Sequence, residues 1–213
     1  MFKYDSKFMG FLSYIADLAL ASLLWTVCSL PVITIGTATT ALHYVCMKLC
    51  KDECGSVWKL FFHAFRVNFR KATRIWLIHL LLILLIGGSF VITLMGYGRD
   101  IPFLSLVRLI LTCFLWMVFS YVYPLTACFE NTVIRTFRNA FLMTVDNFSR
   151  SILIGILSAI PLLICLVSVE MFLRSAIFWL LLGVGIIAYL QARILRKVFQ
   201  KYTPKEETLE ASQ

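Results

Sequence analysis

Charged residues are scarce in this sequence, and long polar segments are missing from it. Only 15% of the 213 residues are charged, 61% are hydrophobic, and the mean hydropathy is +0.88. Soluble domains have about 25% charged and about 45–50% apolar residues. The composition therefore excludes an ordinary soluble domain and indicates a membrane protein.

Catalytic and phosphate-binding motifs are also missing. The sequence has no H-E-x-x-H, no G-x-S-x-G, no glycine-rich phosphate loop and no carboxylate pair at a useful spacing. The three histidines, His43, His63 and His79, have no evident catalytic partner. We therefore expect that the protein is not an enzyme, binds no cofactor and has no catalytic residues.

The seven cysteines are scattered through apolar segments, unlike a disulfide framework. His43, Cys46, Cys50 and Cys54 would form one stripe on a helix, and such soft ligands suit Zn or Cu(I). Structural zinc sites more often use short C-x2-C pairs. We favour a packing stripe of small residues, and we predict no metal site.

Apolar segments long enough to cross a membrane dominate the chain. A spanning helix needs about 20 apolar residues. The segments predicted to lie in the membrane are residues 11–29, 32–47, 75–97, 104–127, 151–170 and 175–193. We predict an all-α, polytopic transmembrane helical bundle of five to six membrane segments, with a single domain over residues 1–202. Residues 203–213 are expected to form a disordered tail.

The first apolar run contains helix-breaking residues. Residues 18–47 carry no Asp, Glu, Lys or Arg, and as one straight helix they would reach roughly 45 Å. Pro31 removes a helical hydrogen bond, and Gly36 relaxes the backbone five residues later. The run is either one kinked span or a hairpin of two segments.

The distribution of basic residues bears on this choice. If the run is a hairpin, 17 of the 20 Lys and Arg residues lie on the cytoplasmic side, against 15 for a single span. We favour the hairpin, in a multi-pass plasma-membrane protein with a cytoplasmic C-terminus. The basic residues lie beside span ends, where they would meet the headgroups of the lipid bilayer, and form no continuous face for nucleic acid.

Two amphipathic stretches lie between the apolar segments, at residues 56–72 and 131–148. Each places aromatic residues on one helical face and basic residues away from it, which is typical of a helix in the membrane interface. They share the spacing [KR]-x2-F-x5-N-F, in Lys59, Phe62, Asn68 and Phe69 and, 79 residues later, in Arg138, Phe141, Asn147 and Phe148. The agreement fits a degenerate internal duplication or chance, and we favour a membrane-anchoring role for both stretches over a gating role.

A few ionisable residues lie within or beside the apolar segments. Asp17 and Arg108 are the ionisable residues expected to lie within or near the hydrocarbon, although each is close enough to a segment end to reach an interface. Glu170 and Arg174 are spaced for an ion pair at a hairpin tip. We interpret His79 as a packing residue rather than a proton relay.

Three blocks of the sequence resemble a known family. These are YIADLALASLLWTVCSLPVITIGTATTALHYV, KDECGSVWKLFFHAFRVNFRKAT and YPLTACFENTVIRTFRNAF, of which L-P-V-x-T-x-G is fairly specific. They are similar to the YesL family of small bacterial membrane proteins, a domain of unknown function found mostly in Firmicutes. The resemblance covers nearly the whole chain except its acidic tail, and Cys128 stands where a basic residue is expected.

The resemblance implies an accessory or regulatory role in carbohydrate uptake, because family members are encoded beside such transporters. Carbohydrate ABC transporter or sensor membrane subunits would then be the partners. The alternative is a small-solute transporter or permease subunit that functions as an oligomer, with the break at Pro31–Gly36 exposing carbonyls to a cavity. As a structural signature we single out Pro31, Thr34, Gly36, Asn68, Pro124 and Asn147.

Overall fold

The structure is a computed structural model that describes residues 6–51, 53, 55–95, 102–174 and 176–202, and these residues contain no strand. The predicted tail at 203–213 lies outside them. The helices are α1 (Ser6–Ser29), the 3-10 turn η1 (Val32–Thr34), α2 (Ile35–Leu49), α3 (Val57–Leu94), α4 (Pro102–Cys128), α5 (Val133–Asp146), α6 (Phe148–Val167), α7 (Val169–Arg174), α8 (Ala176–Phe178), the π-helix η2 (Trp179–Gly183) and α9 (Val184–Tyr202). The predicted all-α class is confirmed.

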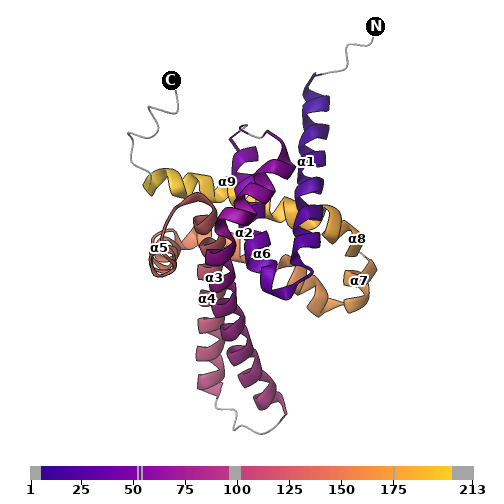
Figure 1. The fold of residues 1–213 in the computed structure, drawn as a ribbon. Coiled ribbons are helices and arrows are strands. Elements are labelled where there is room, and N and C mark those ends of the chain that lie inside the picture. The colour runs from indigo at the N-terminus through magenta and orange to yellow at the C-terminus, as the bar shows by residue number, and fades with distance from the viewer. Residues whose placement is uncertain (1–5, 52, 54, 96–101, 175, 203–213) are drawn as a thin grey trace.

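Four stretches of helix are long and apolar enough to cross a membrane. They are Leu12–Ser29, Val57–Thr93, Phe103–Cys128 and Ala176–Tyr202. A fifth is added if α5 and the first part of α6, which meet at 110°, form one broken span. The architecture is a polytopic helical bundle, in which α3 and α4 run together away from the other helices and α9 crosses near their upper ends (Figure 1).

The first apolar run forms a helical hairpin. Trp25 on α1 donates a hydrogen bond to Thr39 on α2. Trp25 lies seven residues before Val32 in the turn, and Thr39 lies seven residues after it. Contacts between such positions require that the two helices run antiparallel. The run is therefore folded back on itself and is not one kinked helix, although the 15 residues of α2 reach only about 22 Å.

Helix α2 lies at the centre of the molecule. It contacts α1, α3, α4 and α9. Its sequence is rich in small residues, and Ala38, Ala41, Val45 and Cys46 are fully buried. Small side chains let neighbouring backbones approach closely, which is how helices pack within membranes.

The structure changes two predicted boundaries. The amphipathic stretch 56–72 is not a separate interfacial helix, because it continues without a break into the next segment as α3. A buried stripe that includes Phe61, Ala64, Ala72 and Ile75 extends through both parts, and α3 packs on α2. The last segment was predicted to end at residue 193, but α9 continues to Tyr202.

Candidate functional site

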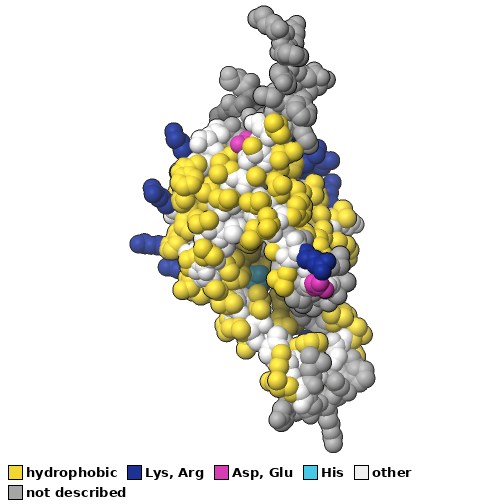
Figure 2. Space-filling model, turned by 90° about the vertical axis from the view of Figure 1, so that its right-hand side faces the viewer, with side chains coloured by type: hydrophobic (Ala, Val, Ile, Leu, Met, Phe, Trp, Pro, Cys, Tyr) yellow, Lys and Arg dark blue, Asp and Glu magenta, His cyan; other side chains and the backbone are white. Residues whose placement is uncertain are grey.

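The helices surround a cavity of about 500 Å³, a volume within the range of small-molecule binding sites. Figure 2 shows a hollow in an apolar surface, with a histidine side chain at its floor. Its lining comes from α1, α2, α3, α4, α6, η2 and α9. The lining residues are Trp25, Thr39, Leu42, His43, His79, Trp116, Phe119, Ser120, Tyr123, Ser158, Pro161, Trp179, Leu180, Val184, Ile187, Ala188 and Gln191.

Aromatic side chains form much of the cavity wall. Trp25 comes from α1, Trp116, Phe119 and Tyr123 come from α4, and Trp179 comes from the start of η2. The described lining contains no Asp, Glu, Lys or Arg. Such a wall offers dispersion contacts and apolar surface to a ligand, and almost no charge.

Most polar groups in the lining are paired within the protein. The pairs are Trp25 Nε1 with Thr39 Oγ1 (3.1 Å), His79 Nδ1 with Tyr123 OH (2.9 Å), Ser120 Oγ with Ser158 Oγ (3.1 Å), Trp116 Nε1 with the Gly155 carbonyl (3.3 Å) and Gln191 Nε2 with the Ile154 carbonyl (3.2 Å). These pairs hold the helices around the cavity together. They also reduce the number of hydrogen-bonding groups left for a ligand.

His43 is the exception in this lining. Its side chain is buried with 5% exposure, and Nδ1 has no hydrogen-bond partner among the described residues. A buried polar atom without a partner costs about 1–3 kcal/mol. Nδ1 itself exposes almost no surface, so a molecule in the cavity would reach this nitrogen only after the imidazole turns over about its Cβ–Cγ bond.

The described residues of the stripe that contains His43 differ in their placement. Cys46 is fully buried in α2, and Cys50 caps the end of that helix. Cys54 lies outside the described residues. No three His, Cys, Asp or Glu residues of the described segments come together as metal ligands.

His79 is held by aromatic neighbours, as the interpretation of a packing residue requires. Its ring stacks on Phe119 with centroids 3.8 Å apart, and it shares a hydrogen bond with Tyr123. Trp76 contacts it edge-on. His79 thus joins α3 to α4 at the edge of the cavity.

Three of the signature residues shape the α1–α2 turn. Thr34 Oγ1 donates to the carbonyls of Cys28 (2.6 Å) and Pro31 (2.7 Å), and Pro31 precedes the 3-10 turn. Gly36 touches α3 so closely that a Cβ there would lie 2.4 Å from the Cβ of Trp76.

None of these three residues lines the cavity. The turn also has few carbonyls without a hydrogen bond, because the Thr34 hydroxyl donates to the Pro31 carbonyl and the Trp76 indole donates to the Val32 carbonyl at 2.6 Å. Residues Pro31 to Gly36 therefore determine how the helices pack rather than the surface that a ligand in this cavity would contact.

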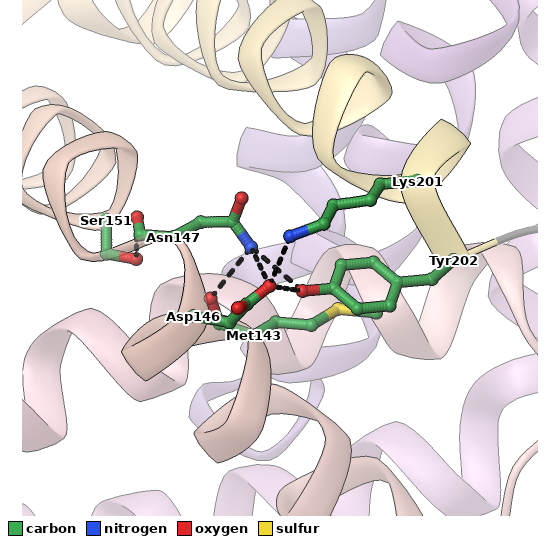
Figure 3. Close-up of polar contacts among 6 residues, drawn as sticks. All are labelled: Met143, Asp146, Asn147, Ser151, Lys201 and Tyr202. Carbon is green, nitrogen blue, oxygen red and sulfur yellow. Dashed lines mark hydrogen bonds and ion pairs between the residues drawn. The ribbon is translucent and has the colours of Figure 1, made fainter.

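The other three signature residues are dispersed over the fold. Asn68 lies within α3, where Nδ2 donates to the Ala64 carbonyl, and Pro124 lies within α4. Asn147 lies at the corner between α5 and α6, beside Asp146 and the end of α9 (Figure 3). The six signature residues are not brought into one site.

Of the two ionisable residues singled out in the apolar segments, Arg108 has contacts that connect two helices. Arg108 on α4 donates to the Ser89 carbonyl and to Thr93 Oγ1, each at 3.2 Å, and its guanidinium lies 5.2 Å from the centre of the Phe90 ring. It therefore joins α3 to α4. Asp17 is half-buried on α1.

Glu170 and Arg174 form the predicted ion pair on the exposed surface of α7.

Sequence patterns did not point to most of the cavity. Trp25, Trp116 and Trp179 are single tryptophans in three separate apolar segments, and Gln191 is an uncharged polar residue in the last one. A polar or aromatic residue inside an apolar helix is a weak signal, because many such residues pack without binding anything. Only the arrangement of the helices brings these four together.

A segment within the N-terminal half of the chain matches a family model. Residues 18–90 match DUF624, a family described as protein of unknown function. The match supports the resemblance to a family of unknown function, and the more specific YesL resemblance stays a prediction. A search of curated proteins and a search of solved structures found no match to the chain.

The DUF624-matching region covers the second half of α1, the turn, α2 and most of α3. It contributes Trp25, Thr39, Leu42, His43 and His79 to the cavity lining. The remaining lining residues lie between positions 116 and 191, outside the match. The cavity is thus completed by residues that follow the segment covered by the family model.

Proposed function

We propose that this multi-pass membrane protein is an accessory or regulatory component of carbohydrate uptake in the plasma membrane, and that it acts without catalysis. The uptake role rests on the resemblance to the YesL family. The DUF624 match assigns no activity and is compatible with this role. The proposed partners are membrane subunits of carbohydrate ABC transporters or sensors.

The composition of the cavity lining favours an accessory role over transport of a sugar. A sugar carries hydroxyl groups on most of its carbons, and each one buried without a partner costs free energy. The lining polar groups that could serve them, such as Ser120, Ser158 and Tyr123, are already paired within the protein. This is the observation that carries the proposal.

The α3–α4 hairpin provides a surface for a partner. It extends away from the rest of the bundle (Figure 1), and its exposed side chains are large and apolar. They include Leu81, Leu84, Leu85, Leu109 and Ile110. In a membrane such a surface faces lipid or packs against a helix of another subunit.

The charges at the end of α9 support a cytoplasmic C-terminus. Arg193, Arg196 and Lys197 border one surface recess together with Gln200. Arg196 also donates to the Cys50 carbonyl, next to the basic segment that contains Lys48 and Lys51. Clustered basic residues beside a span favour the cytoplasmic side.

Site-specific photocrosslinking in the native membrane tests the accessory role. A photoreactive residue at Leu84, on the exposed hairpin, is expected to capture a transporter or sensor membrane subunit repeatedly. The matched control is a photoreactive residue at Ile134, which is equally apolar and is exposed on α5. Capture of lipid alone from Leu84, together with pull-downs that recover no such subunit, would contradict the proposal.

The alternative function is a small-solute transporter or permease subunit that acts as an oligomer. The irregular helix beside the cavity favours it, because η2 is a π-helix and Thr26 on α1 bonds to the Leu180 carbonyl at 3.2 Å. At 24.4 kDa the chain is small for a monomeric carrier. Solute flux in proteoliposomes that is lost in His43→Leu would establish this alternative, and absence of flux with every sugar tested would exclude sugar transport.

A further inference from the structure

The cavity has the size and surface of a site for a small lipid-like molecule. Its volume of about 500 Å³ equals the share of roughly 17 water molecules at about 30 Å³ each. A hydrocarbon chain with a small headgroup fills this space. Trp25, Trp116 and Trp179 would contact such a chain along its length.

The cavity opens in an apolar region of the molecular surface. In Figure 2 hydrophobic side chains border much of the hollow, most basic side chains lie toward the edges of the view, and one basic side chain with an acidic neighbour projects beside the hollow. Leu180, Val184 and Ile187 are apolar residues of the lining. An apolar molecule dissolved in the membrane can enter by such a route without crossing water.

One polar atom in the wall of the cavity has no hydrogen-bond partner among the described residues. His43 is buried, and its Nδ1 has no partner in the described segments, whereas His79 is bonded to Tyr123. A half-turn of the imidazole about its Cβ–Cγ bond exchanges its two edges, so either nitrogen can face the cavity. A neutral imidazole has one donor and one acceptor, and a hydroxyl group can pair with either.

We propose that this cavity binds one uncharged amphiphile, a molecule with a hydrocarbon chain and a single hydroxyl group that hydrogen-bonds to His43. The absence of ionised residues from the described lining argues against a fatty acid or a phospholipid headgroup at this position. The inference does not depend on the uptake role, since it concerns only the purified chain.

Tryptophan fluorescence of the full chain in lipid nanodiscs tests the proposal. The probes are ω-bromoundecanol and bromoundecane, which share a bromine that quenches tryptophan on contact and differ in the hydroxyl. The alcohol is expected to quench saturably, and unlabelled dodecanol is expected to reverse the quenching. His43→Leu should weaken binding of the alcohol about three- to tenfold and leave that of bromoundecane unchanged.

Two further variants complete the test. His63→Leu removes an exposed histidine of α3 and should bind both probes as the wild type does. Ser158→Phe fills the cavity from α6 and should abolish saturable quenching by both probes. If Ser158→Phe does not fold, the comparison of His43→Leu with His63→Leu decides the question alone.

Quenching that never saturates, or that dodecanol does not reverse, would overturn the proposed site. An equal effect of His43→Leu on both probes, or no effect on either, would overturn the recognition of the hydroxyl. Failure of the photocrosslinking experiment would leave these results unaffected, so the binding site and the uptake role are tested separately.

Discussion

The two amphipathic stretches share one residue spacing but have different structures. In the first stretch Asn68 lies inside α3, and the helix continues to Leu94. In the second stretch α5 ends before Asn147, and α6 starts at an angle of 110° to it. The spacing therefore determines which residues share a helical face, and it does not determine whether the helix continues.

One difference between the two stretches at the bend is a buried hydroxyl group. Ser151 Oγ lies 3.0 Å from the Thr144 carbonyl and 3.0 Å from the Tyr121 hydroxyl, and all three residues are fully buried. The position 79 residues earlier is Ala72, which has no hydroxyl. Ser151 can satisfy a carbonyl near the interruption of the helix, and Ala72 cannot.

The neighbours of the two stretches also differ. Lys201 on α9 pairs with Asp146 at 2.7 Å, and the Tyr202 hydroxyl contacts both Asp146 and Asn147 (Figure 3). At the position that corresponds to Asp146 the first stretch has Val67, which is exposed. Helix α2 packs against α3 instead. Tertiary contacts therefore decide between a straight helix and a bend.

The substitution with the largest expected effect disturbs the packing of α2 against the straight stretch. Gly36→Ala places a methyl group against Trp76 and the Ala72 carbonyl, and we expect it to lower the free energy of unfolding by about 2–3 kcal/mol. Gly87→Ala is the matched control, since no atom lies within 4 Å of its Cβ position, and it should be neutral or slightly stabilising. Denaturant titration in detergent measures both, and equal stabilities would contradict the packing argument.

The next effect concerns the bend itself. Ser151→Ala leaves the buried Thr144 carbonyl and Tyr121 hydroxyl with one partner fewer, and we expect a loss of about 2 kcal/mol. Ser149→Ala, at an exposed position of the same helical turn, should change stability by less than about 0.5 kcal/mol. The same titration compares the stabilities of the two variants. If Ser151→Ala is as stable as the wild type, the hydroxyl does not support the bend.

The two asparagines provide the most direct comparison between the stretches. Asn147→Ala removes the 3.1 Å hydrogen bond to Tyr202, and a loss of about 1 kcal/mol is expected. Asn68→Ala removes a bond within one helix and improves helix propensity, so stability should stay the same or rise slightly. Unfolding curves of both variants test whether Asn147→Ala is the less stable of the two. Equal losses of stability would contradict this expectation.

The smallest effect lies in the loop that leads into the first stretch. The hydrogen bond from Lys48 holds the pKa of Glu53 below its ordinary value, and the two groups are 2.8 Å apart. The pair thus stabilises the fold at pH values above the ordinary pKa of a glutamate. This contribution is lost as the pH falls through the lowered pKa of Glu53.

Both side chains of this pair are well exposed, so the contribution is at most a few tenths of a kcal/mol. Between pH 6 and pH 3 the wild type should lose slightly more stability than Glu53→Gln. Acid titration of both proteins checks the sign, and a steeper loss in the variant would show that the pair does not stabilise the fold.

Hydropathy predicted where the apolar helices lie, because each of these helices is formed by a long stretch of sequence with few charged residues. It did not predict the continuity of α3, which depends on α2 packing beside it. It also ended the last segment too early, since charged residues such as Arg193 and Lys197 lower the hydropathy there. Helix α9 continues as an amphipathic helix, with Leu195 and Val198 buried on its other face.

The cavity could not be predicted from the sequence in the same way. His43 and His79 were singled out for other reasons, one as part of a stripe and the other as a packing residue. The pairing of His79 with Tyr123 and the isolation of His43 depend on how α2, α3 and α4 meet. Residue spacing along one helix contains no information about contacts between three.

The contact between Asp146 and the end of α9 has a consequence for biosynthesis. Lys201 and Tyr202 are among the last residues of the described helices to leave the ribosome, whereas the α1–α2 hairpin and α3 are made first. The N-terminal half can thus assemble during translation. The contacts at Asn147 can form only after the C-terminal helix has been made. A nascent chain stalled before residue 201 therefore inserts without the contacts from Lys201 and Tyr202.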